Sequence, residues 1–193
     1  MKINLYYSID LFDAKSGKVL RKGRKLVCHS LLGNYIACLM RIRTDRQQYG
    51  IDVTGTLSYI AVSTYSAALY CYNTAANSTA GLVIGTGNTA VTADDYNLEA
   101  KIIHGIGSGQ MQYGKFEYEE GCFQAPKVEG GSAWFRMTRQ FINNSAGSIV
   151  VKEIGLITSV TPYFLIVRDV LVSPVTVVDA QGIAVTYEFR VTV

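Results

Sequence analysis

A glycine-rich hexapeptide is the first candidate for chemistry in this sequence. Residues 85–90, Gly-Thr-Gly-Asn-Thr-Ala, match the G-x-G-x-x-A pattern with which dinucleotide-binding folds approach a pyrophosphate. In those folds a helix begins directly after the glycines, and an acidic residue about twenty positions later binds the ribose. Here polar turn formers follow, and the glycine-rich residues 105–110 stand where the acid is needed. We therefore expect no nucleotide site, and we assign the glycines to positive φ in a tight turn between strands.

The two histidines are the candidates for a base beside a nucleophilic Cys or Ser. Cys28 and His29 are neighbours in a stretch that we expect to be helical, and adjacent residues on a helix do not face each other. His104 precedes a glycine-rich stretch and is typical of a loop or the end of a hairpin. Neither histidine therefore predicts a catalytic dyad.

Two pairs of adjacent carboxylates could serve a glycoside hydrolase. Asp94–Asp95 suits the first turn of a short helix within residues 92–99, where acids complement the helix dipole. Glu119–Glu120 suits a strand end or a turn. Since nothing in the sequence fixes the separation of two carboxylates, neither pair predicts glycoside hydrolysis. Arg168–Asp169 is typical of an exposed ion pair at the end of a strand, worth about 0 to 1 kcal/mol.

The cysteines show no C-x-x-C or Cys/His spacing that would bring metal ligands together, and we expect reduced thiols at Cys28, Cys38, Cys71 and Cys122. Taken with the motifs above, the sequence predicts no catalytic residue, no metal site and no cofactor. We expect a protein that is not an enzyme.

The strands that must position these residues are clearest at the C-terminal end. From Ile183 to Val193, large apolar residues alternate with smaller or polar ones, which predicts a strand with one buried face. Apolar runs at 134–142 and 149–158 flank the turn sequence Asn143–Gly147 and predict a hairpin. Further short strands are expected in apolar runs at 57–62, 67–72, 82–84, 101–103 and 111–118.

The composition favours a mainly β fold, because charged residues are sparse while Gly, Thr, Ser, Val, Ile and Tyr are plentiful. We expect a single β-rich domain over residues 1–193, built as an antiparallel β-sandwich of jelly-roll-like or immunoglobulin-like type. Apolar residues repeating at three and four positions predict one N-terminal amphipathic helix over residues 26–43. No apolar run is long enough to span a membrane, and we expect no membrane partner.

Positive charge is concentrated in residues 15–46. Nine of the eighteen Lys and Arg residues lie there against one acid, so this segment carries 9 − 1 = +8 and the rest of the chain 9 − 14 = −5. The segment, with its helix, could be a solvated flank, an interface with the acidic part of another copy, or a nucleic-acid contact. Nucleic acid is the least favoured partner, because no aromatic residues interleave the basic run. The candidate assembly interface consists of Lys15, Lys18, Arg21, Lys22, Arg24, Lys25, Arg41, Arg43 and Arg46.

Several short segments between residues 20 and 193 form a recognisable set. They are residues 24–36, 82–87, 95–99, 109–114, 138–145, 151–156, 165–170 and 174–177. As a set, they resemble a family of structural proteins from tailed-bacteriophage virions. The resemblance implies a protein made in the host cytoplasm and located in the virion, present in many copies, with copies of itself and other virion proteins as partners.

The resulting expectation is a non-enzymatic structural protein that assembles into a ring, collar, tail or capsid-decorating layer. The alternative is a receptor- or carbohydrate-binding β module of a fibre or spike, since thirteen tyrosines and one tryptophan could supply surfaces for sugar stacking.

Overall fold

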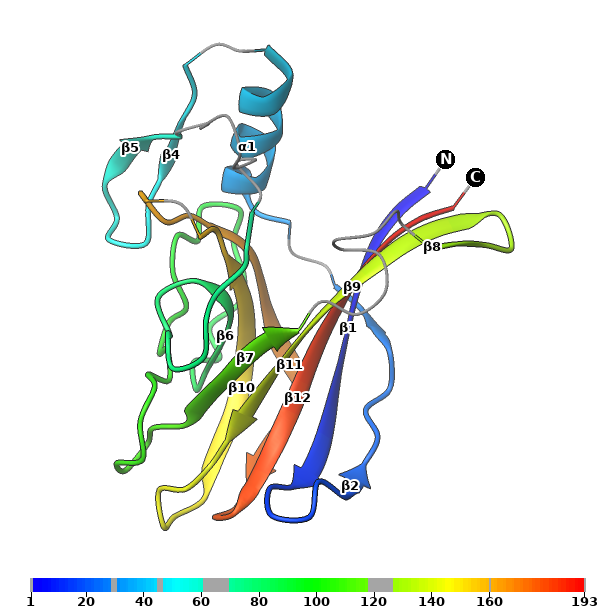
Figure 1. Cartoon of the computed structure of the whole chain (residues 1–193). Coiled ribbons are helices and arrows are strands. Elements are labelled where there is room, and N and C mark those ends of the chain that lie inside the picture. Colours follow the sequence, from blue (N-terminus) through cyan, green and yellow to red (C-terminus); the bar gives the residue numbers. More distant parts are fainter. Residues whose placement is uncertain are drawn as a thin grey trace.

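The computed structural model describes residues 2–28, 31–44, 47–60, 70–117, 127–159 and 161–192. The chain is mainly β, with one short helix, α1 (Gly33–Thr44) (Figure 1). The strands are β1 (Lys2–Asp13), β2 (Val19–Arg21), β3 (Leu26–Val27), β4 (Tyr49–Ile51), β5 (Leu57–Tyr59), β6 (Gly81–Gly85), β7 (Gln112–Glu117), β8 (Lys127–Glu129), β9 (Ser132–Ile142), β10 (Ile149–Ile157), β11 (Leu165–Val177) and β12 (Gln181–Thr192). Within these ranges, no helix has the length and apolar character needed to cross a membrane.

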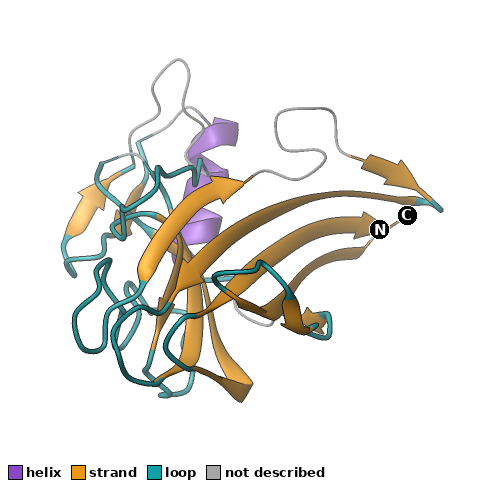
Figure 2. Cartoon of the chain, turned by 60° about the horizontal axis from the view of Figure 1, so that its bottom comes forward, coloured by secondary structure: helices purple, strands orange, loops and turns teal. Residues whose placement is uncertain are grey.

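The large sheet is antiparallel and has the strand order β2-β1-β12-β9-β7, with β3 also paired to β1 and β8 to β9. Strands β1 and β12 pair from Lys2–Thr192 to Asp13–Gln181, so both ends of the described chain lie side by side. Figure 2 shows these long strands extending toward the two termini, away from the helix and most of the loops. The predicted C-terminal strand is confirmed as β12, and the side chains of Ile183, Val185 and Tyr187 are buried.

The small sheet is also antiparallel and has the order β11-β10-β6, while β4 and β5 form a separate two-stranded ribbon. The inner faces of the two larger sheets meet, as a hydrogen bond of 3.1 Å from Tyr187 on β12 to Asp169 on β11 shows. Tyr187 and Val185 from the large sheet share one hydrophobic core with Ile84 and Ile154 from the small sheet.

The short predicted strands had mixed outcomes. Runs 57–62, 82–84 and 111–118 overlap β5, β6 and β7, while residues 61, 62 and 118 lie outside the described residues. Residues 101–103 form no strand, although Lys101 makes an isolated bridge to Gly85. Most of run 67–72 lies outside the described residues, and its last three form no strand.

The predicted hairpin around Asn143 is wrong, because β9 belongs to the large sheet and β10 to the small one. Asn143 is fully buried and fixes this corner. Its backbone N–H donates to the Gln181 carbonyl, and its side-chain Nδ2 donates to the carbonyls of Gly147 and Val177. The turn residues therefore carry the chain from one sheet to the other.

The predicted helix begins too early. Leu26 and Val27 form β3, which pairs with β1 rather than extending α1. Leu32 then donates from its backbone to Ile166 of β11, so the chain reaches the small sheet before the helix starts. Gly33 is the first helical residue, and its backbone N–H donates a hydrogen bond to the Ala93 carbonyl oxygen. A Cβ on Gly33 would lie 3.2 Å from the same oxygen. Pairing with two sheets therefore takes the first apolar residues away from the helix.

Candidate functional site

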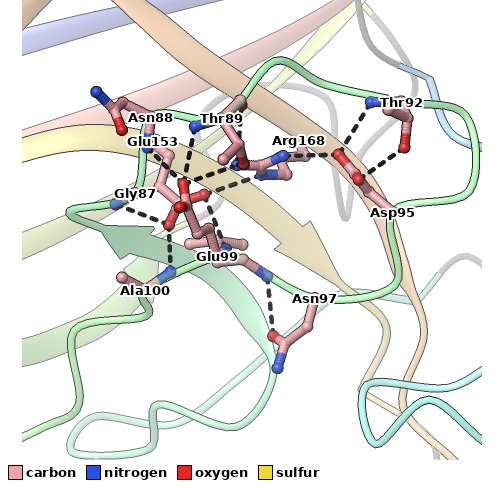
Figure 3. Close-up of polar contacts among 11 residues, drawn as sticks. Gly87, Asn88, Thr89, Thr92, Asp95, Asn97, Glu99, Ala100, Glu153 and Arg168 are labelled. Carbon is pink, nitrogen blue, oxygen red and sulfur yellow. Dashed lines mark hydrogen bonds and ion pairs between the residues drawn. The ribbon is translucent and has the colours of Figure 1, made fainter.

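A buried ion pair connects the two longest strands of the small sheet (Figure 3). Arg168 on β11 donates from Nε to Glu153 on β10 at 2.9 Å, and both side chains are almost inaccessible to water. The Nη1 atom of Arg168 donates to Asp95 at 2.7 Å, and its Nη2 atom lies 3.9 Å from Glu99. One guanidinium therefore spans three carboxylates on the outer face of this sheet.

The glycine-rich loop wraps around two of these carboxylates. Glu153 accepts hydrogen bonds from the amides of Gly87, Glu99 and Ala100 at 3.1, 3.2 and 2.8 Å. Glu99 in turn accepts from the amides of Asn88 and Thr89 at 2.7 and 2.8 Å. Backbone amides that could cradle a phosphate are therefore occupied by carboxylates of the protein itself.

The expectation of positive φ at these glycines is wrong. Neither Gly85 nor Gly87 is among the glycines with positive φ. A Cβ on Gly85 would lie 2.5 Å from a Glu153 carboxylate oxygen, and a Cβ on Gly87 would lie 2.5 Å from the Glu99 Cβ. Close packing against carboxylates, rather than turn geometry, requires glycine here.

The predicted helical turn at 92–99 is also wrong, because these residues form turns and bends. Asp95 accepts from the amide and hydroxyl of Thr92 and from Arg168. Burial opposes its ionisation, but these hydrogen bonds outweigh burial and lower its pKa. Hydrogen bonds from the Thr89 and Asn88 backbone lower the pKa of Glu99. At neutral pH both acids are charged and bound, which suits a structural network rather than proton transfer.

Arg168 and Asp169 do not form the predicted exposed pair. They lie within β11, are both buried, and point to opposite faces of the small sheet. Asp169 accepts from the Cys28 thiol at 2.8 Å and from the Tyr187 hydroxyl at 3.1 Å, within the core. Burial, followed by the nearby Asp169, raises the pKa of Tyr187 well above its usual value.

The remaining candidates for chemistry are dispersed. The Nδ1 atom of His104 accepts the Tyr113 amide in a loop, while His29, Cys122 and Glu119–Glu120 lie outside the described residues. The side chains of Cys28, Cys38 and Cys71 are buried, and none of the three is in a disulfide bond. Burial raises the pKa of Cys38 to about 12.

The candidate assembly residues separate into two groups. Lys15, Lys18, Arg21, Lys22, Arg24 and Lys25 are exposed along the turn and edge beside β1. Arg41 instead lies on α1, where it donates to the Tyr59 hydroxyl at 2.8 Å. The Arg43 side chain and all of Arg46 lie outside the described part of the structure.

The outer face of the large sheet carries a cluster that sequence reasoning missed. Glu188 on β12 accepts from Lys25, from Arg136 Nε at 2.9 Å and from Arg190 Nε at 2.8 Å. With Lys127, the two arginines also lie over the Trp134 ring, 4.4 to 5.6 Å from its centroid. We call Lys25, Lys127, Arg136, Arg190 and Glu188 the cationic cluster.

Glu188 remains charged within this cluster. Burial opposes its ionisation, but hydrogen bonds from Lys25, Arg190 and Arg136 lower its pKa to about 2. The sequence alternation places Glu188 on the polar face, yet only 3% of it is exposed because the cations cover it. Only the register of β9 against β12 brings Arg136 opposite Glu188.

Throughout the described ranges, every buried side-chain nitrogen and oxygen has a hydrogen-bond partner, and no group of metal ligands is found. Comparison with protein-family models, with curated proteins and with solved structures found no match.

Proposed function

We propose that this chain is a non-enzymatic structural protein of a tailed-bacteriophage virion, which assembles into a ring, collar, tail or capsid-decorating layer. The observation that carries the proposal is the surface of residues 19–40. Of nineteen exposed large hydrophobic residues in the described ranges, eight are in this stretch: Val19, Leu20, Leu26, Val27, Leu31, Ile36, Leu39 and Met40. Exposed apolar side chains that cluster on a surface mark interaction sites. Val19, Leu20, Leu26 and Val27 lie on β2 and β3, which both pair with β1 at the edge of the large sheet, whereas Ile36, Leu39 and Met40 lie on α1. The edge beside β1 is therefore the surface that carries the proposal.

The cations of the same stretch support an interface of mixed character. Arg21, Lys22 and Arg24 are exposed between Leu20 and Leu26, so apolar and charged side chains alternate along this edge of the large sheet. An apolar centre with a charged rim is the usual composition of a protein interface. Because the sequence resembles virion proteins, we propose that this interface is used in a virion.

The internal ionic network supports the same proposal. Arg168, Glu153 and Glu99 bind one another and the loop amides, so they fix a loop on the small sheet. The core shared by the two sheets supports a β-sandwich, jelly-roll-like or immunoglobulin-like, as the scaffold for these surfaces.

Charge reversal tests the assembly surface. We expect the wild-type protein to form symmetric oligomers with interfaces above about 1,000 Å². The triple variant R21E/K22E/R24E should shift to monomer in analytical ultracentrifugation while its circular dichroism spectrum is unchanged. Lys25 is left intact because it binds Glu188.

The matched control for this experiment is K152E, a half-exposed cation outside the basic segment, which should assemble normally. A wild-type chain that stays monomeric at high concentration would contradict the proposal.

A pair of exposed tyrosines favours the second candidate, a receptor- or carbohydrate-binding module. Tyr49 and Tyr59 lie on the β4–β5 ribbon with ring centroids 5.9 Å apart, and both are exposed. Aromatic faces of this kind can stack on sugar rings. Binding on a glycan array that is lost in Y49A/Y59A would support this candidate, and an array without binding would remove it.

A further inference from the structure

We infer that the cationic cluster is a docking site for carboxylates on a second copy of this chain, and that the contact runs head to tail. The inference rests on the proposed assembly function and names the two surfaces that meet. One surface is the outer face of the large sheet. The other is the loop on the outer face of the small sheet, which we call the acidic corner: Asp94, Asp95, Glu99, Glu153 and Arg168.

The cationic cluster has donors to spare. Arg136 and Arg190 each use Nε to bind Glu188, while their Nη atoms donate to no group in the described part of the protein. Their side chains are 37% and 25% exposed. The cluster's four cations, three bound to Glu188 and Lys127 over Trp134, and its one carboxylate give 4 − 1 = +3. Glu188 holds the Nε edges, so the outer edges of the guanidinium groups are available for the bidentate pairing that arginine makes with carboxylates.

The acidic corner has the opposite excess. Its four carboxylates and one guanidinium give 1 − 4 = −3, and the balance stays negative if the nearby, half-buried Lys101 is included. Asp94 and Glu99 are exposed to solvent. This corner can therefore present carboxylates to a partner without disrupting its own hydrogen bonds.

The two surfaces lie on opposite outer faces. Tyr187 and Asp169 point inward and bind each other, so their neighbours Glu188 and Arg168 point outward from the large and small sheets respectively. A two-fold contact through either face would place like charges together. A heterologous contact instead pairs the positive face of one copy with the negative face of the next, and such contacts close into rings or continue as filaments.

A protein partner fits this face better than nucleic acid. Trp134 is only 5% exposed because three cations lie over it, so it offers no free surface for base stacking. Two other acids lie on this face: Asp10, which accepts a hydrogen bond from the Gly23 amide, and Glu129, beside the turn between β8 and β9. Counting both leaves a net charge of 3 − 2 = +1, which is still positive.

A mixing experiment with two charge variants tests the inference. K127E/R136Q changes the basic face by −2 − 1 = −3, and D94K/E99Q changes the acidic corner by +2 + 1 = +3. The E99Q substitution keeps a side-chain oxygen for the amides of Asn88 and Thr89. Each variant alone should self-associate at least tenfold more weakly than wild type in analytical ultracentrifugation. An equimolar mixture should form 1:1 complexes and nothing larger, because each pair uses its only intact surfaces.

The controls separate folding from association. D179K, in the turn between β11 and β12, removes an exposed acid elsewhere and should associate like wild type. K127E alone serves if loss of the Arg136–Glu188 pair unfolds the double variant. Raising the salt from 0.05 to 0.5 M should weaken wild-type association, since salt screens exposed charges over about 10 Å at 0.1 M.

Three results would overturn the inference, and they differ in whether they also contradict the proposed assembly function. If wild type assembles and both variants assemble equally well, the docking surfaces are wrong but the assembly function stands. If wild type never associates, the assembly function falls as well. If a labelled DNA oligonucleotide binds wild type but not K127E, and the mixture forms no 1:1 complex, the face is a nucleic-acid site.

Discussion

Arg139 is a fully buried arginine whose donors all go to backbone carbonyls. It binds the carbonyl oxygens of Thr74, Asn77, Ala80, Leu82 and Gly114 at 2.7 to 3.3 Å. Burial lowers its pKa to about 10, so the guanidinium is still charged at neutral pH. A single side chain therefore ties residues 74–82 to the inner face of the large sheet.

Replacing Arg139 should be severely destabilising. R139M removes the arginine donor from five carbonyls, one of which, that of Ala80, keeps a second side-chain donor, Asn73. We expect it to lower the free energy of unfolding by roughly 3 to 5 kcal/mol, the range for breaking a buried charged network. Urea unfolding followed by circular dichroism measures this. The control is Q140A, whose side chain is exposed on the next position of the same strand and whose effect should stay within about 0.5 kcal/mol. A loss below about 1 kcal/mol for R139M would show that the carbonyls find other partners.

The sequence contains a signal for Arg139 that the strand prediction did not use. Phe135, Met137, Arg139 and Phe141 occupy alternate positions of the predicted strand, so the arginine falls on its apolar face. If the predicted face is right, a charged side chain at such a position must be buried together with hydrogen-bonding partners. If the predicted face is wrong, the side chain is exposed. Its five acceptors come from residues 74–80, from Leu82 on β6 and from Gly114 on β7, and the sequence does not show that these segments meet the strand.

At the scale of elements, Glu188 fastens three segments distant in sequence. It lies on β12, Arg136 lies on β9, and Lys25 lies just before β3. The three are brought together only by the register of the large sheet. Ionisation of this one carboxylate should therefore be linked to the stability of the sheet edge.

The linkage has a definite direction. The pKa of Glu188 is lowered to about 2 in the folded protein, against about 4.3 for an unperturbed glutamate. Its contribution is therefore present above about pH 4.3 and lost as the pH falls toward 2. In urea unfolding at pH 7, 5, 4 and 3, the stability difference between wild type and E188Q should shrink below pH 5. A difference that does not change with pH would contradict the linkage, because the other acids titrate equally in both proteins.

Strand faces could be predicted from the sequence, whereas strand partners could not. Alternation along residues 183–193 identified the buried face of β12, because side-chain direction is a local property. The turn sequence at Asn143 gave no sign that β9 and β10 enter different sheets, because that choice depends on Asn143 bonding to Gln181 and Val177. Helix α1 was shortened by long-range pairing of the same kind.

At the scale of the whole molecule, charge segregation along the chain differs from charge segregation in space. Of the predicted interface cations whose side chains the structure describes, only Lys25 belongs to the cationic cluster. Lys127, Arg136 and Arg190 join it from β8, β9 and β12. The acidic side is likewise built from a loop and two strands. Counting charges by segment therefore does not identify Lys127, Arg136 and Arg190, which the fold brings together with Lys25.

The antiparallel pairing of β1 with β12 predicts that a circular permutant of this protein will fold faster than the wild type. A permutant that joins residues 193 and 1 by a short Gly/Ser linker, and opens at Gly130–Gly131, turns this pair into a hairpin of neighbouring strands. Both glycines have positive φ with open space around them, which suits a break in the chain. Stopped-flow refolding should be faster for the permutant, because sequence separation of contacts slows folding. An unchanged refolding rate would mean that another step limits folding.

The same pairing also orders events during synthesis. Strand β1 leaves the ribosome before β12, and the twelve consecutive residue pairs between them form only when β12 follows. Until then, one side of β1 has no permanent neighbour, and the apolar residues Leu5, Tyr7 and Ile9 have no completed core to enter. An unpaired apolar strand is a template for association with other chains. The interval between the synthesis of β1 and the synthesis of β12 is thus the stage at which this protein is most exposed to misassembly.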